Sequence, residues 1–153
     1  MKDQVIFRRA GMGDLPVLVG MLADDELGRK RENFTDPLPD SYTAAFEEIE
    51  QDGNNELVVA ERDGRICGMI QLTFTPCLTY QGGWRCTVEG VRTASSERGK
   101  GLGTQMFEWA IARAKERGCH VIQLTTDNQR PDARRFYEKL GFKASHVGMK
   151  LHF

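Results

Sequence analysis

The segment from residue 84 to residue 126 constrains the fold more than any other part of the sequence. It contains a strand pattern (WRCTVEGVRT, 84–93), a glycine-rich turn, a helical pattern that begins at Leu102 and ends at Gly118, and a nearly continuous apolar run typical of a buried strand (HVIQLTT, 120–126). A strand–helix–strand unit of this kind predicts two parallel strands joined by a right-handed crossover.

The other elements predict strands that pair mainly in antiparallel fashion. Further helices are expected over 15–22, 41–51 and 132–139, with a polar loop or broken helix over 24–40. Further strands are expected over 5–9, 56–62, 65–75, 142–147 and 148–153. Asp14 and Ser41 are the expected caps of the first two helices, and the Asp63-Gly64 pair predicts a hairpin turn.

This order predicts one domain over residues 1–153, of the α/β (α+β) class. We expect a mixed, mostly antiparallel sheet of about seven strands, with helices on both faces. The last strands would leave an exposed sheet edge to be covered, which favours a homodimer.

Composition excludes several classes of partner. The net charge of −1 provides no general basic field for nucleic acid or for an anionic membrane, and no apolar stretch approaches the length of a membrane span. The four cysteines form no CxxC pair, so we expect free thiols that pack as small hydrophobic groups in a reducing cytoplasm. No metal site is expected.

Three glycines, Gly99, Gly101 and Gly103, stand at the start of the long helix. Glycine destabilises a helix and has a high backbone entropy, so its use here indicates that a ligand approaches the backbone closely. The first amides of a helix have no intrahelical acceptor, and the helix dipole favours negative charge there. The loop therefore predicts an anion site, most simply for a phosphate.

Two familiar phosphate loops do not fit the spacing. A Walker loop needs glycine where Ala94 stands and serine or threonine where Gly101 stands. A dinucleotide fingerprint needs a third glycine where Thr104 stands, although Asp127 imitates its acidic ribose ligand. A glycine turn without a ligand is less consistent with the basic residues Arg98 and Lys100 beside these glycines.

The RGKGLG segment (98–103) resembles the (Q/R)xxGx(G/A) signature of the GNAT acetyltransferase superfamily. VEGVRT (88–93) looks like the fourth strand of that family, and ARRFYEKLGF (133–142) is similar to its C-terminal motif, A-x-x-x-Y-E-K-x-G-F. The resemblance covers residue 84 onward, while the N-terminal third agrees only in element order. It implies a GNAT-like fold and transfer of the acetyl group of acetyl-CoA to a primary amine by direct attack in a ternary complex.

The resemblance also implies how acetyl-CoA, the cosubstrate, is held. The pantetheine arm would pair with main-chain groups of the fourth strand, in a gap beside the strand over 120–126, and an amide near Val91 would polarise the thioester carbonyl. The pyrophosphate would lie on the loop amides, which the glycines leave uncovered. The implied cofactor-binding residues are Val91, Arg92, Thr93, Arg98, Gly99, Lys100, Gly101, Leu102, Gly103, Thr104, Asn128, Arg130, Phe136 and Tyr137.

Two residues are the candidates for proton transfer. Tyr137 matches the family tyrosine, and the resemblance implies that it is the acid that protonates the sulfur of coenzyme A. Its position also has the helical spacing of a core residue. One side chain can serve both roles, with the ring packed and the hydroxyl free. Glu89, two residues before Val91, is a candidate general base, directly or through water, or else a solvated strand carboxylate. Weaker alternatives are Tyr80, His120 and His146.

The chain departs from the family at one position. Arg130 stands where family members often carry an asparagine, and Asn128 lies two residues earlier. Either Asn128 replaces that contact or it is lost. Arg130, Arg134 or Lys139 can instead meet the 3′-phosphate of the nucleotide, or lie on the surface.

The acceptor site is expected from the first two helices, residues 24–33 between them, and residues 76–85. Asp24, Asp25 and Glu26 can attract a cationic amine there, or belong to a solvated face. The acceptor is a small-molecule amine or a protein amine, and the resemblance does not choose between them. An alternative function is a non-catalytic CoA-binding sensor or assembly module of the same fold. A nucleotide-dependent oxidoreductase is a third reading.

Overall fold

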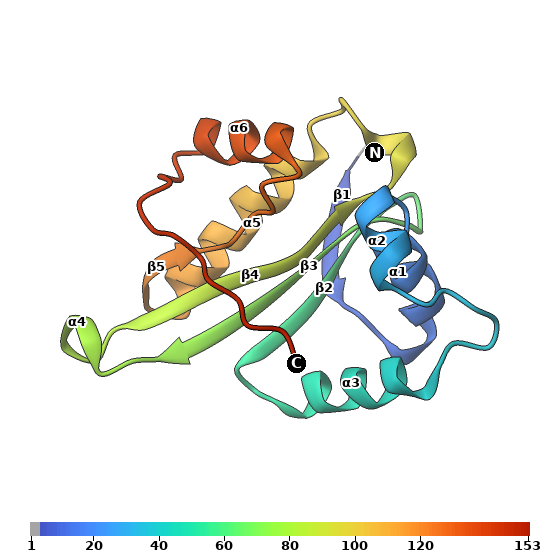
Figure 1. Ribbon diagram of the computed structural model, residues 1–153, viewed down its shortest axis with the longest axis horizontal. Coiled ribbons are helices and arrows are strands. Elements are labelled where there is room, and N and C mark those ends of the chain that lie inside the picture. Colours follow the sequence, from blue (N-terminus) through green and yellow to red (C-terminus); the bar gives the residue numbers. More distant parts are fainter. Residues whose placement is uncertain (1–3) are drawn as a thin grey trace.

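A five-stranded sheet forms the centre of the computed structural model, which describes residues 4–153 (Figure 1). Residues 1–3 of the expected domain lie outside the described residues. The sheet has the order β1 (Val5–Arg9), β2 (Asn55–Arg62), β3 (Arg65–Pro76), β4 (Trp84–Thr93) and β5 (Cys119–Gln123). Strands β1 to β4 pair in antiparallel fashion, and β5 runs parallel to β4. The α+β class and the parallel crossover are therefore confirmed.

Helices cover both faces of the sheet, as expected. They are α1 (Leu15–Leu22), α2 (Glu26–Arg31), α3 (Asp40–Gln51), α4 (Thr79–Gly82), α5 (Leu102–Glu116) and α6 (Pro131–Lys139), with 3-10 turns η1 (Met12–Asp14) and η2 (Ser95–Glu97). Figure 1 shows α5 and α6 together, away from α1 and α3. Adjacent residues of β2 point to opposite faces, so Val58 packs toward α5 and Val59 toward α1 and α3.

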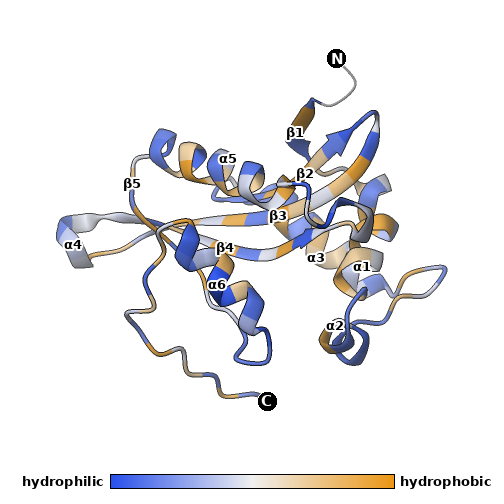
Figure 2. Cartoon of the chain, turned by 90° about the horizontal axis from the view of Figure 1, so that it is seen from above, coloured by the Kyte–Doolittle hydropathy of each residue, from blue (hydrophilic) through white to orange (hydrophobic). Residues whose placement is uncertain are grey.

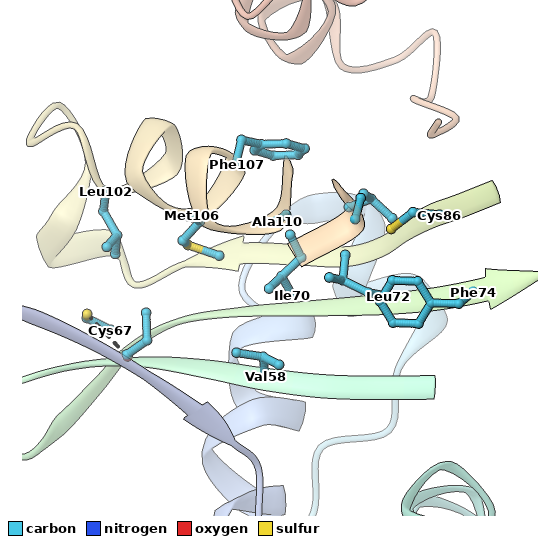
Figure 3. Packing of buried hydrophobic residues seen from close by; sticks show 13 residues of the cluster. Val58, Cys67, Ile70, Leu72, Phe74, Cys86, Leu102, Met106, Phe107 and Ala110 are labelled. Atoms are coloured by element: carbon cyan, nitrogen blue, oxygen red, sulfur yellow. Dashed lines mark hydrogen bonds between the residues drawn. The ribbon is translucent and has the colours of Figure 1, made fainter. Parts of the chain in front are cut away.

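The larger core, which we call the α5 cluster, lies between α5 and the sheet (Figure 3). The helical spacing predicted that Met106, Phe107 and Ala110 share one face, and all three are fully buried there. Phe74 meets them from β3. Burial of each large side chain stabilises the fold by roughly 1.5–3 kcal/mol, so α5 and the loop before it are firmly fixed on the sheet.

The second core, which we call the α1–α3 cluster, lies on the opposite face. It joins Leu15 and Leu18 of α1, Phe46 of α3, and Val59 and Met69 of the sheet. The chain between these two helices, expected as a loop or broken helix, contains α2. The sheet therefore separates a face covered by α5 and α6 from a face covered by α1 and α3, which come from the N-terminal third of the chain.

A buried ion pair ties α5 to the sheet. Glu56 of β2 is 2% exposed, and Arg113 of α5 donates three hydrogen bonds of 2.8–3.1 Å to its carboxylate. Arg9 and Arg117 lie 3.5 and 3.8 Å from the same carboxylate. Burial by itself raises the pKa of Glu56, but the hydrogen bonds and charges of these arginines outweigh it and hold that pKa below its ordinary value.

The helix caps differ from those expected. Asp14 accepts a hydrogen bond from the amide of Gly11 and pairs with Arg8 at 2.8 Å, so its carboxylate serves η1 and β1 rather than α1. Helix α3 begins at Asp40, with Pro39 as N-cap, instead of after Ser41. The φ of −53° at Pro39 already suits a helix start, which explains the earlier beginning.

The two C-terminal strands expected over 142–153 are absent from the structure, so the sheet has five strands rather than seven. Figure 2 shows this segment running away from the body of the molecule. Val147, Met149 and Leu151 are 83–91% exposed. The alternating pattern of a strand is present, but a strand also needs a neighbouring edge, and within residues 4–153 this segment has none.

Strand β5 is consequently an edge strand and not the buried strand that its apolar run predicted. His120, Val121 and Gln123 are exposed. Its inner edge pairs with β4, and its outer edge has no strand beside it among the described residues. The apolar residues of β5 therefore lie on a strand whose outer edge the described residues leave uncovered.

No helix among residues 4–153 is long and apolar enough to cross a bilayer. All four cysteines are free thiols, as expected. Cys67 and Cys86 are buried, and burial raises the pKa of Cys86 to about 12, while Cys77 and Cys119 are partly exposed. The two buried thiols pack as small hydrophobic groups.

Candidate active site

Strand β4 continues past the end of its parallel neighbour. Pairing between β4 and β5 ends at Thr87 and Gln123, and β5 itself ends at Gln123. From Val88 to Thr93, β3 is the only strand of the described chain that pairs with β4. The expected gap beside β4 is therefore present in the strand pairing. It exposes one row of β4 main-chain groups to which an extended ligand can hydrogen-bond as a strand would.

A β-bulge, which the sequence reading missed, lies in this part of β4. Gly90 and Val91 together face the single residue Ile70 of β3, and Gly90 has a φ of +60° that favours glycine. After the bulge, Val91 packs against the α5 cluster while Arg92 reaches Asp25, before α2. Glycine inside a strand pattern was the signal that could have revealed it.

The glycine loop has the backbone of an anion cradle. Gly99 and Gly101 have φ values of +77° and +78°, and an added Cβ at either would meet no atom within 4 Å. Glycine is thus required there by conformation and not by crowding. Gly101 is the N-cap of α5, and no side chain among residues 4–153 caps the helix. The first-turn amides of Leu102, Gly103 and Thr104 therefore remain available to a ligand.

Buried contacts fix both ends of this loop. Before it, Glu97 is 7% exposed and accepts a hydrogen bond of 3.2 Å from Arg62 of β2. After it, Leu102 is 1% exposed, so its side chain belongs to the core and only its amide is available to a ligand. A Cβ on Gly103 would lie 3.1 Å from Phe136, which assigns that glycine to the packing of α6 on α5. Pairing of Glu97 with Arg62 was not foreseen.

Tyr137 combines a packed ring with an unengaged hydroxyl. Its ring centroid lies 5.3 Å from that of Phe107, 5.4 Å from that of Phe136 and 6.0 Å from that of Phe142. The hydroxyl makes no hydrogen bond to any residue of the range 4–153. Burial raises the pKa of this phenol above its ordinary value, and the nearby charges of Arg92 and Arg130 only partly oppose that. Tyr137 is thus a protonated acid at neutral pH.

An arginine pair lies next to this tyrosine. Arg130, the N-cap residue of α6, places Nη2 2.8 Å from Oδ2 of Asp25, and Nη2 of Arg92 lies 4.0 Å from the same oxygen. Asp25 also caps α2 by accepting a 2.6 Å hydrogen bond from the amide of Gly28. All three residues were singled out in the sequence, but nothing in its local patterns indicated that they meet.

The remaining candidates lie apart from this centre. Glu89 is exposed on β4 and has no hydrogen-bond or ion-pair partner within the described residues. Asn128 is exposed in the turn that Asp127 closes by bonding the amides of Gln129 and Arg130. Thr93 is partly buried at the end of β4, Arg98 and Lys100 are exposed in the glycine loop, and Thr104 is exposed in the first turn of α5.

The weaker alternatives for proton transfer do not join the centre. The rings of Tyr80 and His120 stack at a centroid distance of 4.8 Å beside α4, at the opposite end of β4 from the glycine loop (Figure 1). His146 bonds to Ser145 in the exposed C-terminal segment. No group of three or more potential metal ligands occurs within residues 4–153.

Comparison with known proteins agrees with this geometry. The model of the acetyltransferase (GNAT) family matches residues 23–142. The chain is 33% identical over 95 residues to the aminoalkylphosphonate N-acetyltransferase of Salmonella typhimurium, a match that spans 62% of this chain and 61% of that enzyme. It is 28% identical over 150 residues to the L-methionine sulfoximine/L-methionine sulfone acetyltransferase of Pseudomonas paraeruginosa, across 94% of this chain and 85% of that protein.

A solved structure is closer in sequence. The transcriptional regulator from Bacillus halodurans C-125 superposes with a TM-score of 0.95 at 65% identity, over 98% of this chain and 100% of that one. The family match extends across α2, the glycine loop and α6, and so includes every element of the candidate site. The chain therefore belongs to the acetyltransferase (GNAT) family, a family of acyltransferase enzymes.

Proposed function

We propose that this protein moves the acetyl group of acetyl-CoA to the primary amine of a small molecule by direct attack in a ternary complex. The observation that carries the proposal is the uncapped start of α5, which η2 and the glycine loop connect to the part of β4 that β5 leaves free. An extended molecule with an anionic group at one end fits a free strand edge that leads to an anion cradle. Acetyl-CoA has that shape, with a pyrophosphate separated from its thioester by the pantetheine arm.

The residues fit each part of the cosubstrate. The amides of residues 99–104 are suited to the pyrophosphate, and the exposed side chains of Arg98 and Lys100 add positive charge. Main-chain groups of Val91, Arg92 and Thr93 lie on the β4 edge that β5 leaves free and are suited to the arm. We keep Asn128, which lies just before α6, and Phe136, which lies on α6 against Gly103, as further candidate contacts.

The chemistry then needs three groups of this chain. An amide in the bulge near Val91 would donate to the carbonyl oxygen as negative charge develops there. As the amine nitrogen bonds to the carbonyl carbon, the carbon–sulfur bond breaks and Tyr137 gives its proton to the sulfur. Glu89, directly or through water, takes the proton that the amine loses. Its exposed position is consistent with the water-mediated route.

The names of two relatives support a small-molecule acceptor. One is named for aminoalkylphosphonates and the other for L-methionine sulfoximine and sulfone, which are small amines. We therefore favour a small-molecule amine over a protein amine.

The alternative is a CoA-binding sensor or assembly module that does not catalyse. Steady thiol release from acetyl-CoA in the presence of an amine supports the enzyme. Tight binding of acetyl-CoA by calorimetry, with no release for any amine, supports the module. Binding of NAD in place of coenzyme A would indicate the oxidoreductase.

We also propose a homodimer in which the C-terminal segment of each chain pairs with the β5 edge of the other. In this segment Val147, Met149, Leu151 and Phe153 alternate with Gly148, Lys150 and His152, and all four apolar side chains are exposed. A second copy supplies the missing edge partner for both the segment and β5, which a partner of another kind would not do reciprocally. The free thiols are consistent with a single cytoplasmic N-acetyltransferase domain over 1–153.

A further inference from the structure

Three arginines from different elements gather around one carboxylate. Arg31 comes from α2, Arg92 from β4 and Arg130 from the start of α6, and the charge of each acts on Asp25. Burial raises the pKa of Asp25, but its bond from the Gly28 amide and these arginines outweigh burial and lower it. Figure 2 shows α2 and α6 on the same open side of β4.

The positive charge of this cluster exceeds its negative charge. Arg31 pairs with Glu32 at 2.8 Å, which leaves the carboxylate of Asp25 to two guanidinium groups. The side chains of Arg92 and Arg130 are only 17% and 24% exposed. Burial lowers the pKa of Arg92, and the charge of Arg130 lowers it further, as expected for two cations that one carboxylate does not neutralise.

Both guanidinium groups also have unused donors. Within residues 4–153, the Nε atoms of Arg92 and Arg130 are buried and have no hydrogen-bond partner. Nη2 of Arg130 is also buried without a hydrogen bond, although it lies 2.8 Å from Asp25 as an ion pair. Nη1 of Arg92 donates to the carbonyl of the adjacent Val91, and Nη2 lies too far from Asp25 for a good hydrogen bond. Buried charged donors are normally paired, because leaving them unpaired is costly. A ligand with anionic oxygens would satisfy them, and two planar forks suit a carboxylate or a phosphonate.

The cluster faces the acceptor side of the molecule. Arg92 pairs with Met69 of β3, whose side chain belongs to the α1–α3 cluster, whereas the glycine loop leads into α5 on the other face. Arg130 starts from α6 on the α5 face, but its guanidinium reaches across to Asp25 before α2. These side chains are thus directed away from the phosphate cradle of residues 99–104. The phenol of Tyr137 lies within the field of both arginines.

From this arrangement we infer that the acceptor is an anionic amine, whose carboxylate, phosphonate or phosphate group is bound by Arg92 and Arg130. The inference rests on the proposed acetyl transfer and specifies its acceptor. Fixing the anionic end beside Tyr137 orients a short aminoalkyl chain with its amine toward the gap in β4. Asp25 then holds the two guanidinium groups in position rather than attracting the amine.

The test compares acceptors that differ only in the anionic group. Thiol release is followed with β-alanine, 2-aminoethylphosphonate and O-phosphoethanolamine, each against the neutral amines propylamine and ethanolamine. We expect kcat/KM to be at least 100-fold higher for one of the anionic amines, and the best of the three identifies the anionic group. Equal kcat/KM for anionic and neutral amines would overturn the inference while leaving acetyl transfer intact.

Variants connect that preference to the cluster. Arg130→Met should lower kcat/KM for the preferred anionic amine at least 30-fold more than it lowers kcat/KM for a neutral amine. Arg130→Lys keeps the charge but loses the planar fork of the guanidinium. Its kcat/KM for the preferred anionic amine should lie between those of wild type and Arg130→Met. The matched control is Arg135→Met, which removes an exposed arginine of α6, 72% exposed, and should change neither value. Equal losses for both classes of amine in Arg130→Met contradict the assignment.

A binding measurement separates this inference from the proposed function. Protein saturated with coenzyme A is titrated with the three anionic amines by calorimetry, using wild type and Arg92→Met, with circular dichroism to verify folding. Binding to wild type that the variant loses supports the anion site even if no amine is acetylated, in which case only the proposed function fails. Absence of binding by all three amines, or equal binding by both proteins, overturns the inference.

Discussion

Replacing Tyr137 with phenylalanine separates the two roles that one side chain combines. The variant keeps the ring, and with it the edge contacts to Phe107, Phe136 and Phe142. It loses only a hydroxyl that bonds to no residue of the described chain. The free energy of unfolding should therefore change by less than about 1 kcal/mol, and the acetyl-CoA affinity should change little.

Turnover should fall much more than stability. The thiol of coenzyme A has a pKa near the ~8.5 typical of thiols, so a thiolate can leave without help, and a proton donor contributes at the lower end of acid catalysis, about 10²-fold. That factor corresponds to about 2.7 kcal/mol of the barrier. Because burial holds the pKa of Tyr137 above its ordinary value of 10, the phenol keeps its proton throughout the neutral range.

The assay is thiol release under saturating acetyl-CoA and amine, with chemistry rate-limiting, from pH 6.5 to 9.5. The loss in Tyr137→Phe should shrink above about pH 8.5, where the thiolate needs no proton. Tyr42→Phe is a contrasting control, because its hydroxyl bonds to Glu32 and to the amide of Asn33. It should lose about 1 kcal/mol of stability and keep its turnover.

Two results would refute this reasoning. If Tyr137→Phe keeps more than half of the wild-type turnover near neutral pH, the phenol is not the acid. If the loss is equal at every pH, the hydroxyl positions substrate instead of donating a proton.

Three further changes have defined outcomes. Glu56→Ala removes the carboxylate that accepts three hydrogen bonds from Arg113, which then keeps, among the described residues, only its exposed partner Glu116. Urea denaturation at pH 7 should therefore show a loss of about 1.5–3 kcal/mol, against less than about 0.5 for the exposed Glu26→Ala. Because the folded-state pKa of Glu56 is depressed from 4.5, this contribution should be complete above about pH 4.5 and disappear as pH falls through the lower folded value. Gly101→Ala places a Cβ at a φ of +78°, so calorimetry should show acetyl-CoA affinity lowered roughly tenfold or more, a cost of about 1–2 kcal/mol. Met149→Asp combined with Leu151→Asp should convert a dimer to a monomer in light scattering at micromolar concentration.

Each of these has a contrary result. Similar losses in Glu56→Ala and Glu26→Ala would mean that the buried pair is not stabilising. Unchanged acetyl-CoA affinity in Gly101→Ala would mean that the glycine loop does not hold the pyrophosphate. A monomeric wild type would contradict the proposed homodimer.

Local patterns in the sequence were enough to predict much of the fold. The periodicity of Met106, Phe107 and Ala110 predicted α5, and the hairpin forms at Asp63-Gly64, whose φ values are both positive. The start of α5 follows Gly101 as expected, because the left-handed conformation needed there is a property of a few adjacent residues.

Features that depend on distant residues were not predictable in this way. Asp25, Arg92 and Arg130 meet only because a cap, a bulged strand and a helix start are folded together. The bulge at Gly90 left a sequence signal that was not read. The segment over 142–153 has the alternating pattern of a strand, but such a pattern does not specify the strand with which the segment pairs.

The central claim is that the chain catalyses acetyl transfer from acetyl-CoA to an amine. The most direct measurement incubates the purified protein with acetyl-CoA and a panel of small amines, and follows free thiol together with the mass of the amine. We predict steady thiol release for at least one amine, in equal amount to a product heavier by one acetyl group, and about 10²-fold slower with Tyr137→Phe. Binding of acetyl-CoA without release of thiol for any amine would contradict the claim.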